Sequence, residues 1–383
     1  MTSIVVHYSE IGTKGQNRVF FEKKLVQNIQ KACRFSDVPV RRLFGRIFIG
    51  PSENLDYANT SEKLREIPGI AWFSEADRLA TEMEALRQAV ADLELPEGDY
   101  RFRVEARRSK KDFPIESMDI NREIGAQIQE RTGWQVDLTN PDYTLYIDVT
   151  HQGIFLYQAK ERGIGGLPVG VSGKLICMLS GGIDSPVAAF KMFSRGCRIV
   201  YTHFHNYSRD AKQVREKVVR LVEILNRYQH RSRLYLVPFA DFQQALVTVV
   251  PADCRMVAYR RVMFHIAGRI LEREKALGFV TGDSVGQVAS QTLENLQTIY
   301  EASGHPVFAP LIGEDKQSIM DLSKKIGTYE TSIQPYDDCC TFLVDPHPKT
   351  KMRLEEAQLY EDRIPLDEYC KKVQESAEII EIE

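Results

Sequence analysis

Residues 174–186 read KLICMLSGGIDSP, an apolar run followed by a loop with two glycines and then a proline. Leu175 to Leu179 predicts a buried strand, and Ser185-Pro186 predicts the start of a helix with Ser185 as its N-cap. Two adjacent glycines let the backbone turn tightly enough for several N–H groups to converge on one anion. The segment therefore predicts a phosphate-binding turn between a strand and a helix.

Downstream of this loop, short apolar runs alternate with amphipathic stretches. Residues 199–203, 234–237 and 279–281 read as strands, and 214–225 reads as a helix with one apolar face. Strands separated by helices predict a doubly wound parallel sheet over residues 167–383. In such sheets ligands bind beyond the carboxyl ends of the strands, where the glycine loop lies.

Upstream of the loop, the chain predicts two smaller units. Residues 1–77 have the order β-α-β-β-α-β of a ferredoxin-like (α+β) unit, with a hairpin near Gly45 and a second helix over 61–67. Residues 78–166 predict a helix over 83–93, a strand over 100–106, a further helix and a final hairpin. Closely spaced glycines between 163 and 173 then mark a linker.

Composition limits the possible classes of protein. With 383 residues, 43% of them hydrophobic and 27% charged, the chain fits a soluble globular protein of two or three domains. No apolar run approaches the roughly 18 residues that a membrane helix needs. Seven cysteines without a CxxC spacing predict neither a disulfide framework nor a zinc site, and a reducing cytoplasm is expected. The net charge of −3 means that a nucleic-acid surface would have to come from local basic clusters.

The string Ser180-Gly181-Gly182-Ile183-Asp184-Ser185 resembles the pyrophosphatase loop (PP-loop) of the adenine nucleotide alpha-hydrolase superfamily, and it is not the GxxxxGK[ST] P-loop. A plain strand-to-helix turn is the alternative. The resemblance implies that ATP is cleaved between its α and β phosphates, that Asp184 is catalytic, and that Mg²⁺ offsets the repulsion between Asp184 and phosphate. It also implies that the nucleotide contacts Met178, Leu179, Ser180, Gly181, Gly182, Asp184, Ser185, His203 and Phe204.

A second string, residues 281–292, reads TGDSVGQVASQT and begins where a predicted strand ends. It resembles the second nucleotide motif of the same group, and a polar loop with a helix cap is the alternative. The resemblance implies ATP contacts from Gly282, Gln287 and Gln291. Arg260 matches a basic position near the nucleotide, and Lys316 is a further candidate for the phosphates, although a lone lysine is usually a solvated surface group.

A basic cluster in the second unit suggests an RNA surface. Residues 101–111 read RFRVEARRSKK, and alternation along a strand places Arg101, Arg103 and Glu105 on one face. A solvated charged edge is the alternative. The run from 102 to 149 resembles the THUMP domain of RNA-modification enzymes, whose family profile can start near residue 60. Residues 8–18, YSEIGTKGQNR, resemble the opening of 4-thiouridine synthases. The expected RNA contacts are Lys14, Arg18, Arg107, Arg108, Lys110 and Lys111.

The segment Asp337-Asp338-Cys339-Cys340 supplies a candidate for sulfur chemistry. Thiolate-type sulfur is a strong nucleophile, although a cysteine pair is more often a pair of small buried hydrophobes. The resemblance to 4-thiouridine synthases implies one functional cysteine in this segment, and Cys340 aligns better with it than Cys339. Cys177 and Cys197 are expected in the core. An iron–sulfur cluster remains an open alternative without a CxxC motif.

Together these strings resemble the tRNA 4-thiouridine synthase (ThiI) family in a form without a rhodanese domain, because about forty residues follow Cys340. The resemblance implies ATP-dependent adenylation of uridine 8 in tRNA and its replacement by 4-thiouridine, with a cysteine desulfurase or another persulfide carrier as sulfur donor. A homodimer is expected, and a role in thiamine thiazole synthesis is doubtful. Two rivals stay open: another adenylating PP-loop enzyme acting on a small acid or nucleotide, and a non-catalytic THUMP RNA-binding protein.

Overall fold

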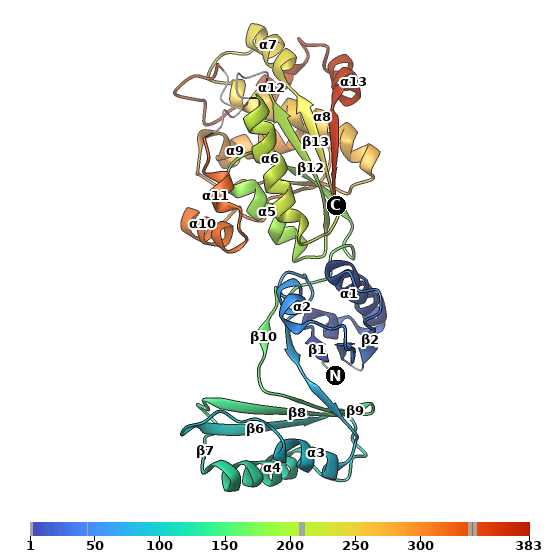
Figure 1. Cartoon of the computed structure of the whole chain (residues 1–383). Coiled ribbons are helices and arrows are strands. Elements are labelled where there is room, and N and C mark those ends of the chain that lie inside the picture. Colours follow the sequence, from blue (N-terminus) through green and yellow to red (C-terminus); the bar gives the residue numbers. More distant parts are fainter. Residues whose placement is uncertain (1–2, 44, 207–210, 336–338, 340–342) are drawn as a thin grey trace. The chain divides into compact units, whose positions relative to one another are not determined.

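The computed structural model describes residues 3–43, 45–206, 211–335, 339 and 343–383. The chain divides into two compact units, residues 1–167 and 168–383, which are considered separately (Figure 1). Within the described ranges, no helix is both long enough and apolar enough to cross a membrane.

The first sheet of unit 1 confirms the ferredoxin-like fold. Its strand order is β10-β4-β1-β3-β2, and each neighbouring pair is antiparallel. Asp56 caps helix α2 by accepting a hydrogen bond from the backbone N–H of Asn59 at 3.2 Å. The helix therefore begins at Tyr57, and the expected start at residue 61 is wrong. The elements are β1 (Ile4–His7), α1 (Arg18–Cys33), β2 (Val40–Leu43), β3 (Arg46–Ile49), α2 (Tyr57–Leu64), β4 (Trp72–Glu75) and β10 (Glu161–Arg162).

The second sheet of unit 1 has the order β5-β9-β8-β6-β7 and carries α3 and α4 on one face. Along β6 the apolar Phe102 and Val104 are buried under these helices, whereas Arg101 and Arg107 are exposed on the other face. This alternation is the one expected from the sequence. The elements are β5 (Asp77–Leu79), α3 (Met83–Ala91), β6 (Arg101–Arg108), α4 (Ser117–Thr132), β7 (Gln135–Val136), β8 (Tyr143–Thr150) and β9 (Gly153–Tyr157).

A buried polar group joins the two sheets of unit 1. Asp148 on β8 accepts hydrogen bonds from Arg46 of β3 at 2.5 Å and from the hydroxyl of Tyr157 at 3.0 Å. His7 stacks on Trp72 with ring centroids 3.8 Å apart, and burial, followed by the charge of Arg46, lowers the pKa of His7 to about 3. His7 is therefore neutral in the folded protein at physiological pH.

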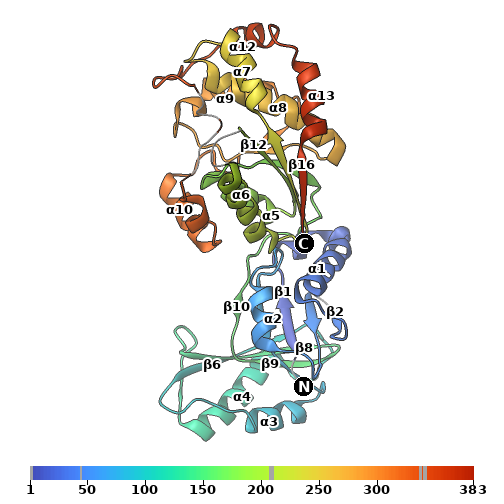
Figure 2. The same ribbon diagram turned by 45° about the horizontal axis from the view of Figure 1, so that its top comes forward.

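Unit 2 contains a mostly parallel sheet of order β15-β14-β11-β12-β13-β16. Helices α5 and α6 lie on one face, and α7, α8 and α13 lie on the other (Figures 1 and 2). The chain builds outward from β11 through β12 and β13, then returns to add β14 on the opposite side of β11. The loops after β11 and β14 therefore flank a topological switch point, where ligands bind in such sheets.

The elements of unit 2 are β11 (Lys174–Met178), α5 (Asp184–Phe193), β12 (Arg198–His205), α6 (Ala211–Asn226), β13 (Ser232–Pro238), α7 (Ala240–Val249), α8 (Arg255–Glu274), β14 (Phe279–Val280), α9 (Leu293–Glu301), β15 (Val307–Phe308), α10 (Lys316–Lys325), α11 (Tyr329–Ser332), α12 (Leu354–Glu361), α13 (Leu366–Ser376) and β16 (Glu378–Ile382). The expected parallel sheet is confirmed for β15, β14, β11, β12 and β13, and β16 pairs antiparallel with β13 at its edge. The helices after the cysteine segment also pack on the body of the unit.

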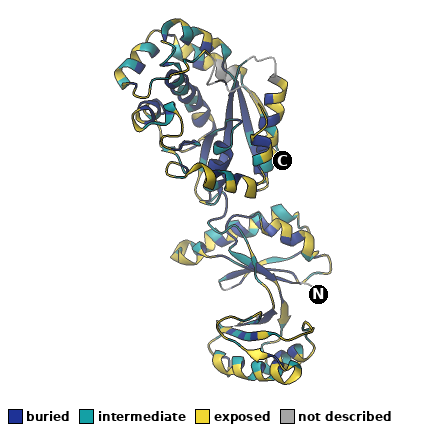
Figure 3. Cartoon of the chain, turned by 90° about the vertical axis from the view of Figure 1, so that its left-hand side faces the viewer, coloured by how far each residue is buried: buried dark blue, intermediate teal, exposed yellow. Residues whose placement is uncertain are grey.

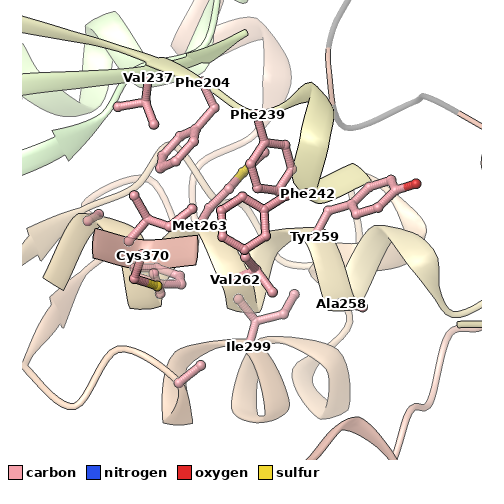
Figure 4. Packing of buried hydrophobic residues seen from close by; sticks show 14 of the residues in the cluster. Phe204, Val237, Phe239, Phe242, Ala258, Tyr259, Val262, Met263, Ile299 and Cys370 are labelled. Carbon is pink, nitrogen blue, oxygen red and sulfur yellow. The ribbon is translucent and has the colours of Figure 1, made fainter. Parts of the chain in front are cut away.

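The core of unit 2 lies between the sheet and helices α7, α8 and α9. Phe204, Val237 and Phe239 from the sheet side meet Val262 of α8 and Ile299 of α9 (Figure 4). The central strands β11 to β14 are buried along most of their length, and the helices expose their outer residues (Figure 3). Cys177 and Cys197 are buried, as expected. This packed layer fixes the ends of β11, β12 and β14, which form the floor of the site.

Candidate functional site

A pocket of about 430 Å³ opens at the carboxyl ends of β11, β12 and β14. One side is the loop after β11, another is the loop after β14, and helix α8 contributes a third. The sequence motifs therefore meet in space although about 100 residues separate them. The pocket is lined by Met178, Leu179, Ser180, Gly182, Asp184, Ser185, Thr202, His203, Phe204, Met256, Arg260, Met263, Phe264, Thr281, Gly282, Asp283, Gln287, Val288, Ser290, Gln291 and Cys339.

The glycine loop is closed by its two serines. The hydroxyl of Ser185 accepts a hydrogen bond from the backbone N–H of Ser180 at 2.9 Å, and the hydroxyl of Ser180 accepts one from the N–H of Gly182 at 3.3 Å. Helix α5 begins at Asp184, so the expected N-cap role of Ser185 is wrong. The hydroxyl is instead used to fold the loop back on itself, and this shapes a turn beside the start of a helix.

Asp184 lies at the pocket edge with two polar partners. The ammonium group of Lys316 is 2.6 Å from one carboxylate oxygen, and the amide of Gln287 donates to the other at 2.8 Å. Lys316 is the first residue of α10, which Asp315 caps by accepting from the N–H of Ser318 at 3.0 Å. The cap thus fixes the lysine opposite the loop. The positive charge of Lys316 offsets the negative charge of Asp184 and so reduces the repulsion between Asp184 and a phosphate.

Gly282 lets the second motif approach the first. A methyl group added at this position would lie 2.6 Å from the backbone nitrogen of Ser185 and 2.8 Å from the carbonyl carbon of Asp184. Neither backbone atom can move away without distorting the start of α5. A glycine at residue 282 is therefore required by packing between the two loops.

Asp283 is the centre of a buried polar cluster beside this contact. Its carboxylate accepts from Nη2 of Arg260 at 2.7 and 2.9 Å, from the hydroxyl of Tyr300 at 2.7 Å and from the amide of Gln291 at 3.1 Å. Burial alone would raise the pKa of Asp283, but the charge and hydrogen bonds of Arg260 outweigh it and hold that pKa below its usual range. The cluster therefore contains a carboxylate and a guanidinium, both charged.

The opposite wall of the pocket is apolar and includes residues that the sequence analysis missed. Met256, Met263 and Phe264 line the pocket together with Arg260, and all four belong to α8. Their spacing of i, i+4, i+7 and i+8 is that of one helix face, so periodicity could have found them once Arg260 was placed. Asp283 was also missed, although its position directly after a strand end and a glycine is a usable signal.

His203, a predicted ATP contact, is 4% exposed at the pocket floor. Its Nδ1 lies 2.9 Å from the carbonyl oxygen of Leu179. Because a carbonyl only accepts, Nδ1 must carry the proton in this contact. The histidine thereby holds the end of β11 against β12, beside the glycine loop.

Most of the predicted nucleotide residues line the pocket, and two do not. Gly181 lies within the loop between residues that line it, and Lys316 reaches the site through Asp184. The predicted catalytic Cys340 lies outside the described residues. Its neighbour Cys339 lines the pocket, is 6% exposed and contacts the carbonyl oxygen of Phe204 through its sulfur at 3.3 Å. The side chain of Gln243 also donates to the backbone carbonyl of Cys339.

The six predicted RNA-contacting residues differ in their surroundings. Arg107 is 70% exposed and pairs with Glu105 at 2.6 Å, and Lys111 is exposed. Arg108 is largely buried because its guanidinium donates to the carbonyls of residues 113 and 115, so it shapes the loop that carries Lys110 and Lys111. Arg18 donates to the side chains of residues 8 and 22, and the ammonium of Lys14 lies over the ring of residue 21. Arg107 and Lys111 are therefore the most accessible members of the set.

Models of three families match the chain in consecutive segments. The ThiI ferredoxin-like domain matches residues 3–74, the THUMP domain matches 80–158, and the family described as thiamine biosynthesis protein (ThiI) matches 170–366. The third match alone covers more than half of the chain and includes both nucleotide motifs.

Whole-chain comparisons agree with these matches. The chain is 39% identical over 381 residues to a probable tRNA sulfurtransferase of Caldanaerobacter subterraneus, covering 99% of both chains. It is also 39% identical over 386 residues to one of Acetivibrio thermocellus, covering 99% of this chain and 98% of that protein. A solved 4-thiouridine synthetase–RNA complex with bound ATP is 36% identical and covers all of both chains with a TM-score of 0.90. PH1313 from Pyrococcus horikoshii shares the fold at 24% identity and a TM-score of 0.65, covering 85% of this chain and all of that chain.

Proposed function

The chain belongs to the ThiI family of tRNA sulfurtransferases, and from this premise we propose that it adenylates uridine 8 of tRNA in the pocket between β11 and β14 and then replaces the uridine oxygen with sulfur. The observation that carries the proposal is the meeting of the SGGIDS loop, the TGDS loop and Arg260 around one pocket. No second function is favoured by a specific contact.

In the adenylation step, O4 of the uridine attacks the α-phosphate of ATP, and the proton on N3 passes to solvent and returns when 4-thiouridine forms. The new bond joins O4 to phosphorus, and pyrophosphate leaves with the electrons of the bond between the α- and β-phosphates. The glycine loop and the start of α5 offer backbone N–H groups and a helix terminus to the charge on the leaving pyrophosphate. Lys316 adds a positive charge at the same edge of the pocket. These groups act by placing donors where negative charge collects.

Mg²⁺ fits this site as a companion of the nucleotide. Among the described residues, no group of three or more His, Cys, Asp or Glu side chains is arranged to hold a metal ion by protein contacts alone. Asp184 supplies one carboxylate at the pocket edge, and Mg²⁺ commonly binds through one or two carboxylates plus substrate phosphates. Asp184 would hold the ion, which would neutralise phosphate charge when bound.

In the sulfur step, the terminal sulfur of a persulfide on Cys340 attacks C4 of the adenylated uridine. A carbon–sulfur bond forms, and AMP leaves with the former O4. A second thiol then attacks the sulfur of Cys340, which breaks the sulfur–sulfur bond and releases 4-thiouridine. The two thiols are left as a disulfide, which a cellular reductant reduces to thiols again. Cys339, the residue before Cys340, lines the pocket, and this supports placing the sulfur step beside the nucleotide.

We place the tRNA against the exposed Arg107 on β6 and the exposed Lys111 in the loop after β6, where both side chains offer positive charge to phosphates. The sulfur donor in this proposal is a cysteine desulfurase or another persulfide carrier. The protein would act in the cytoplasm, because tRNA and reduced thiols are found there. We also propose that it acts as a homodimer.

The test is reconstitution with the purified full chain, unmodified tRNA, Mg-ATP, and a cysteine desulfurase with cysteine. Nucleoside analysis by liquid chromatography and mass spectrometry should detect 4-thiouridine at position 8, with one AMP and one pyrophosphate released per modified tRNA. An Asp184→Asn variant is the matched control and should lose both products.

Two results would redirect the proposal. Pyrophosphate release that requires a small acid or a free nucleotide instead of tRNA would favour another adenylating enzyme. Normal 4-thiouridine formation by Asp184→Asn would remove the assigned role of the SGGIDS loop.

A further inference from the structure

We propose that Asp283 is a positioning residue of the nucleotide site, which orients Arg260 and Gln291 toward ATP and is itself held by Tyr300. This inference rests on the proposed function, because it assumes that ATP occupies the pocket between β11 and β14. It gives a role to Asp283, which lines the pocket but was not among the predicted ATP contacts, and to Tyr300, which does not line the pocket.

The first support is the set of partners around the Asp283 carboxylate. Arg260 and Gln291 both line the pocket, and both donate to Asp283, which is 3% exposed. A carboxylate only accepts hydrogen bonds, so it fixes which atoms of its partners face it. The Gln291 amide must turn its NH₂ group toward Asp283, and the plane of the Arg260 guanidinium is set by two contacts from Nη2.

Tyr300 holds the Asp283 carboxylate in place through a hydrogen bond. Its hydroxyl donates to Asp283 at 2.7 Å and lies 3.2 Å from the hydroxyl of Thr281. Tyr300 is on α9 and is not among the residues that line the pocket. It therefore touches the carboxylate from behind, and its removal would loosen Asp283 without changing the surface that faces a nucleotide.

The neighbouring residue Arg261 provides an internal comparison. It forms a similar buried pair with Glu361, at 2.7 and 2.8 Å, but it does not line the pocket. Helix α8 thus carries two adjacent arginines, each paired with a buried carboxylate. One pair faces the pocket, and the other joins α8 to α12. Breaking either pair should weaken the fold, whereas only the first should change nucleotide binding.

The physical gain is preorganisation. A guanidinium on a long side chain loses rotamer freedom when it binds a ligand, and a partner that already holds it lowers that cost. The charge of Asp283 also offsets that of Arg260 before a nucleotide arrives. Arg260 can then contribute directed hydrogen bonds with less rearrangement on binding.

The experiment compares Asp283→Asn with the control Glu361→Gln in the full chain. ATP affinity is measured by titration calorimetry, and thermal stability is measured by differential scanning fluorimetry without nucleotide. Both variants should melt at lower temperature than the parent protein. Asp283→Asn should weaken ATP binding about tenfold or more, and Glu361→Gln should leave it within about twofold. Equal ATP affinity of the two variants would overturn the proposal.

Two further variants keep the test decisive if Asp283→Asn folds poorly. Tyr300→Phe should weaken ATP binding about two- to fivefold with little loss of thermal stability, and unchanged affinity would count against the positioning role. In an Arg260→Gln, Gln291→Ala background, Tyr300→Phe should have almost no further effect on affinity, because its influence passes through those side chains. A full effect in that background would overturn the proposal.

The same set separates this inference from the proposed function. If Arg260→Gln binds ATP as tightly as the parent protein, the assignment of the pocket itself is wrong, and the positioning role falls with it. If Arg260→Gln weakens binding while Asp283→Asn and Tyr300→Phe do not, the pocket assignment stands and only the positioning role is wrong.

Discussion

At the scale of single residues, the site is defined by charges that meet across the pocket edge. Asp184 begins a helix and would repel phosphate, yet Lys316 lies 2.6 Å from it on an element more than 130 residues later. The SGGIDS string predicts the aspartate, because its spacing is local. The lysine could be named only as a weak candidate, because no local pattern distinguishes it from a solvated surface residue.

The first prediction concerns this lysine. Lys316→Met should raise the KM for ATP about tenfold or more, because the positive charge that Lys316 places beside Asp184 and the phosphates is then lost. Lys316→Arg should retain most of the affinity. Lys191, which pairs with Glu314 at 2.5 Å and does not line the pocket, supplies the control Lys191→Met. Steady-state pyrophosphate release measures all three, and a similar loss in Lys191→Met would show that the effect is general.

The second prediction separates the two adjacent cysteines. Cys340→Ser should abolish 4-thiouridine formation while pyrophosphate release in the presence of tRNA continues, because only the sulfur step needs the thiol. Cys339→Ser should retain measurable sulfur transfer, although it alters the pocket wall. Nucleoside analysis and a pyrophosphate assay on the same samples provide both readouts. Retention of 4-thiouridine in Cys340→Ser with loss in Cys339→Ser would exchange the two roles.

At the scale of elements, the sequence predicted order better than ends. Alternation and 3.6-residue periodicity identified the longer strands and helices, because burial of one face is a local pattern, whereas the two- and three-residue strands β5, β10 and β15 were not predicted. The start of α2 was placed late, since Asp56 caps a first turn that is mostly polar. The antiparallel β16 could not be predicted from its residues, because edge pairing with β13 depends on how the chain returns after α13.

The third prediction tests the contact between the two loops. Gly282→Ala should reduce ATP-dependent pyrophosphate release strongly, because its methyl group would lie 2.6 Å from the backbone nitrogen of Ser185. Overpacking of this kind costs about 1–3 kcal/mol, which unfolding in urea can measure. Gly268→Ala in α8 is the control, since nothing lies within 4 Å of its added methyl group. That variant should be active and as stable as the parent or slightly more so.

At the scale of the whole molecule, the proposed sites of chemistry and of RNA recognition belong to separate parts of the chain. Unit 2 holds the nucleotide pocket, and unit 1 holds the basic strand with its exposed arginines. Both tryptophans, Trp72 and Trp134, lie in unit 1, so tryptophan fluorescence reports on that unit within the intact protein. Unit 1 can therefore be followed separately without cutting the chain.

The fourth prediction uses this probe for pH dependence. The pKa of His7 is about 3 in the folded protein against an ordinary value of 6.5, so the unfolded chain binds the proton more tightly between these values. The contribution of His7 to stability is complete above pH 6.5 and is lost as the pH falls toward 3. Unit 1 should lose up to about 1.4 kcal/mol per pH unit below pH 6 from this source.

The comparison is with His7→Phe, which keeps an aromatic ring beside Trp72. Urea unfolding followed by tryptophan fluorescence at pH 7 and pH 5 should show a smaller loss of stability in His7→Phe than in the parent protein. Equal losses in the two proteins would mean that His7 has a similar pKa in the folded and unfolded states.

The fifth prediction concerns tRNA binding. Arg107→Gln should weaken binding and reduce the slope of log affinity against log salt by about one, because one phosphate contact is lost. Arg122→Gln is the matched control, since Arg122 is 75% exposed on α4, on the other side of the β6–β8 sheet. Its slope should equal that of the parent protein. A similar change in both variants would place the RNA elsewhere or make the effect one of net charge.

Apart from Cys339, the residues that line the pocket come from 178–204 and 256–291, which lead into the sheet on opposite sides of its switch point. A nucleotide bound there would contact both segments and so connect the β11–β12 side of the sheet with the β14 side. Ligand affinity would then appear as resistance to unfolding that grows with nucleotide concentration. The melting temperature of unit 2 in a cell would therefore rise with the concentration of ATP around the protein.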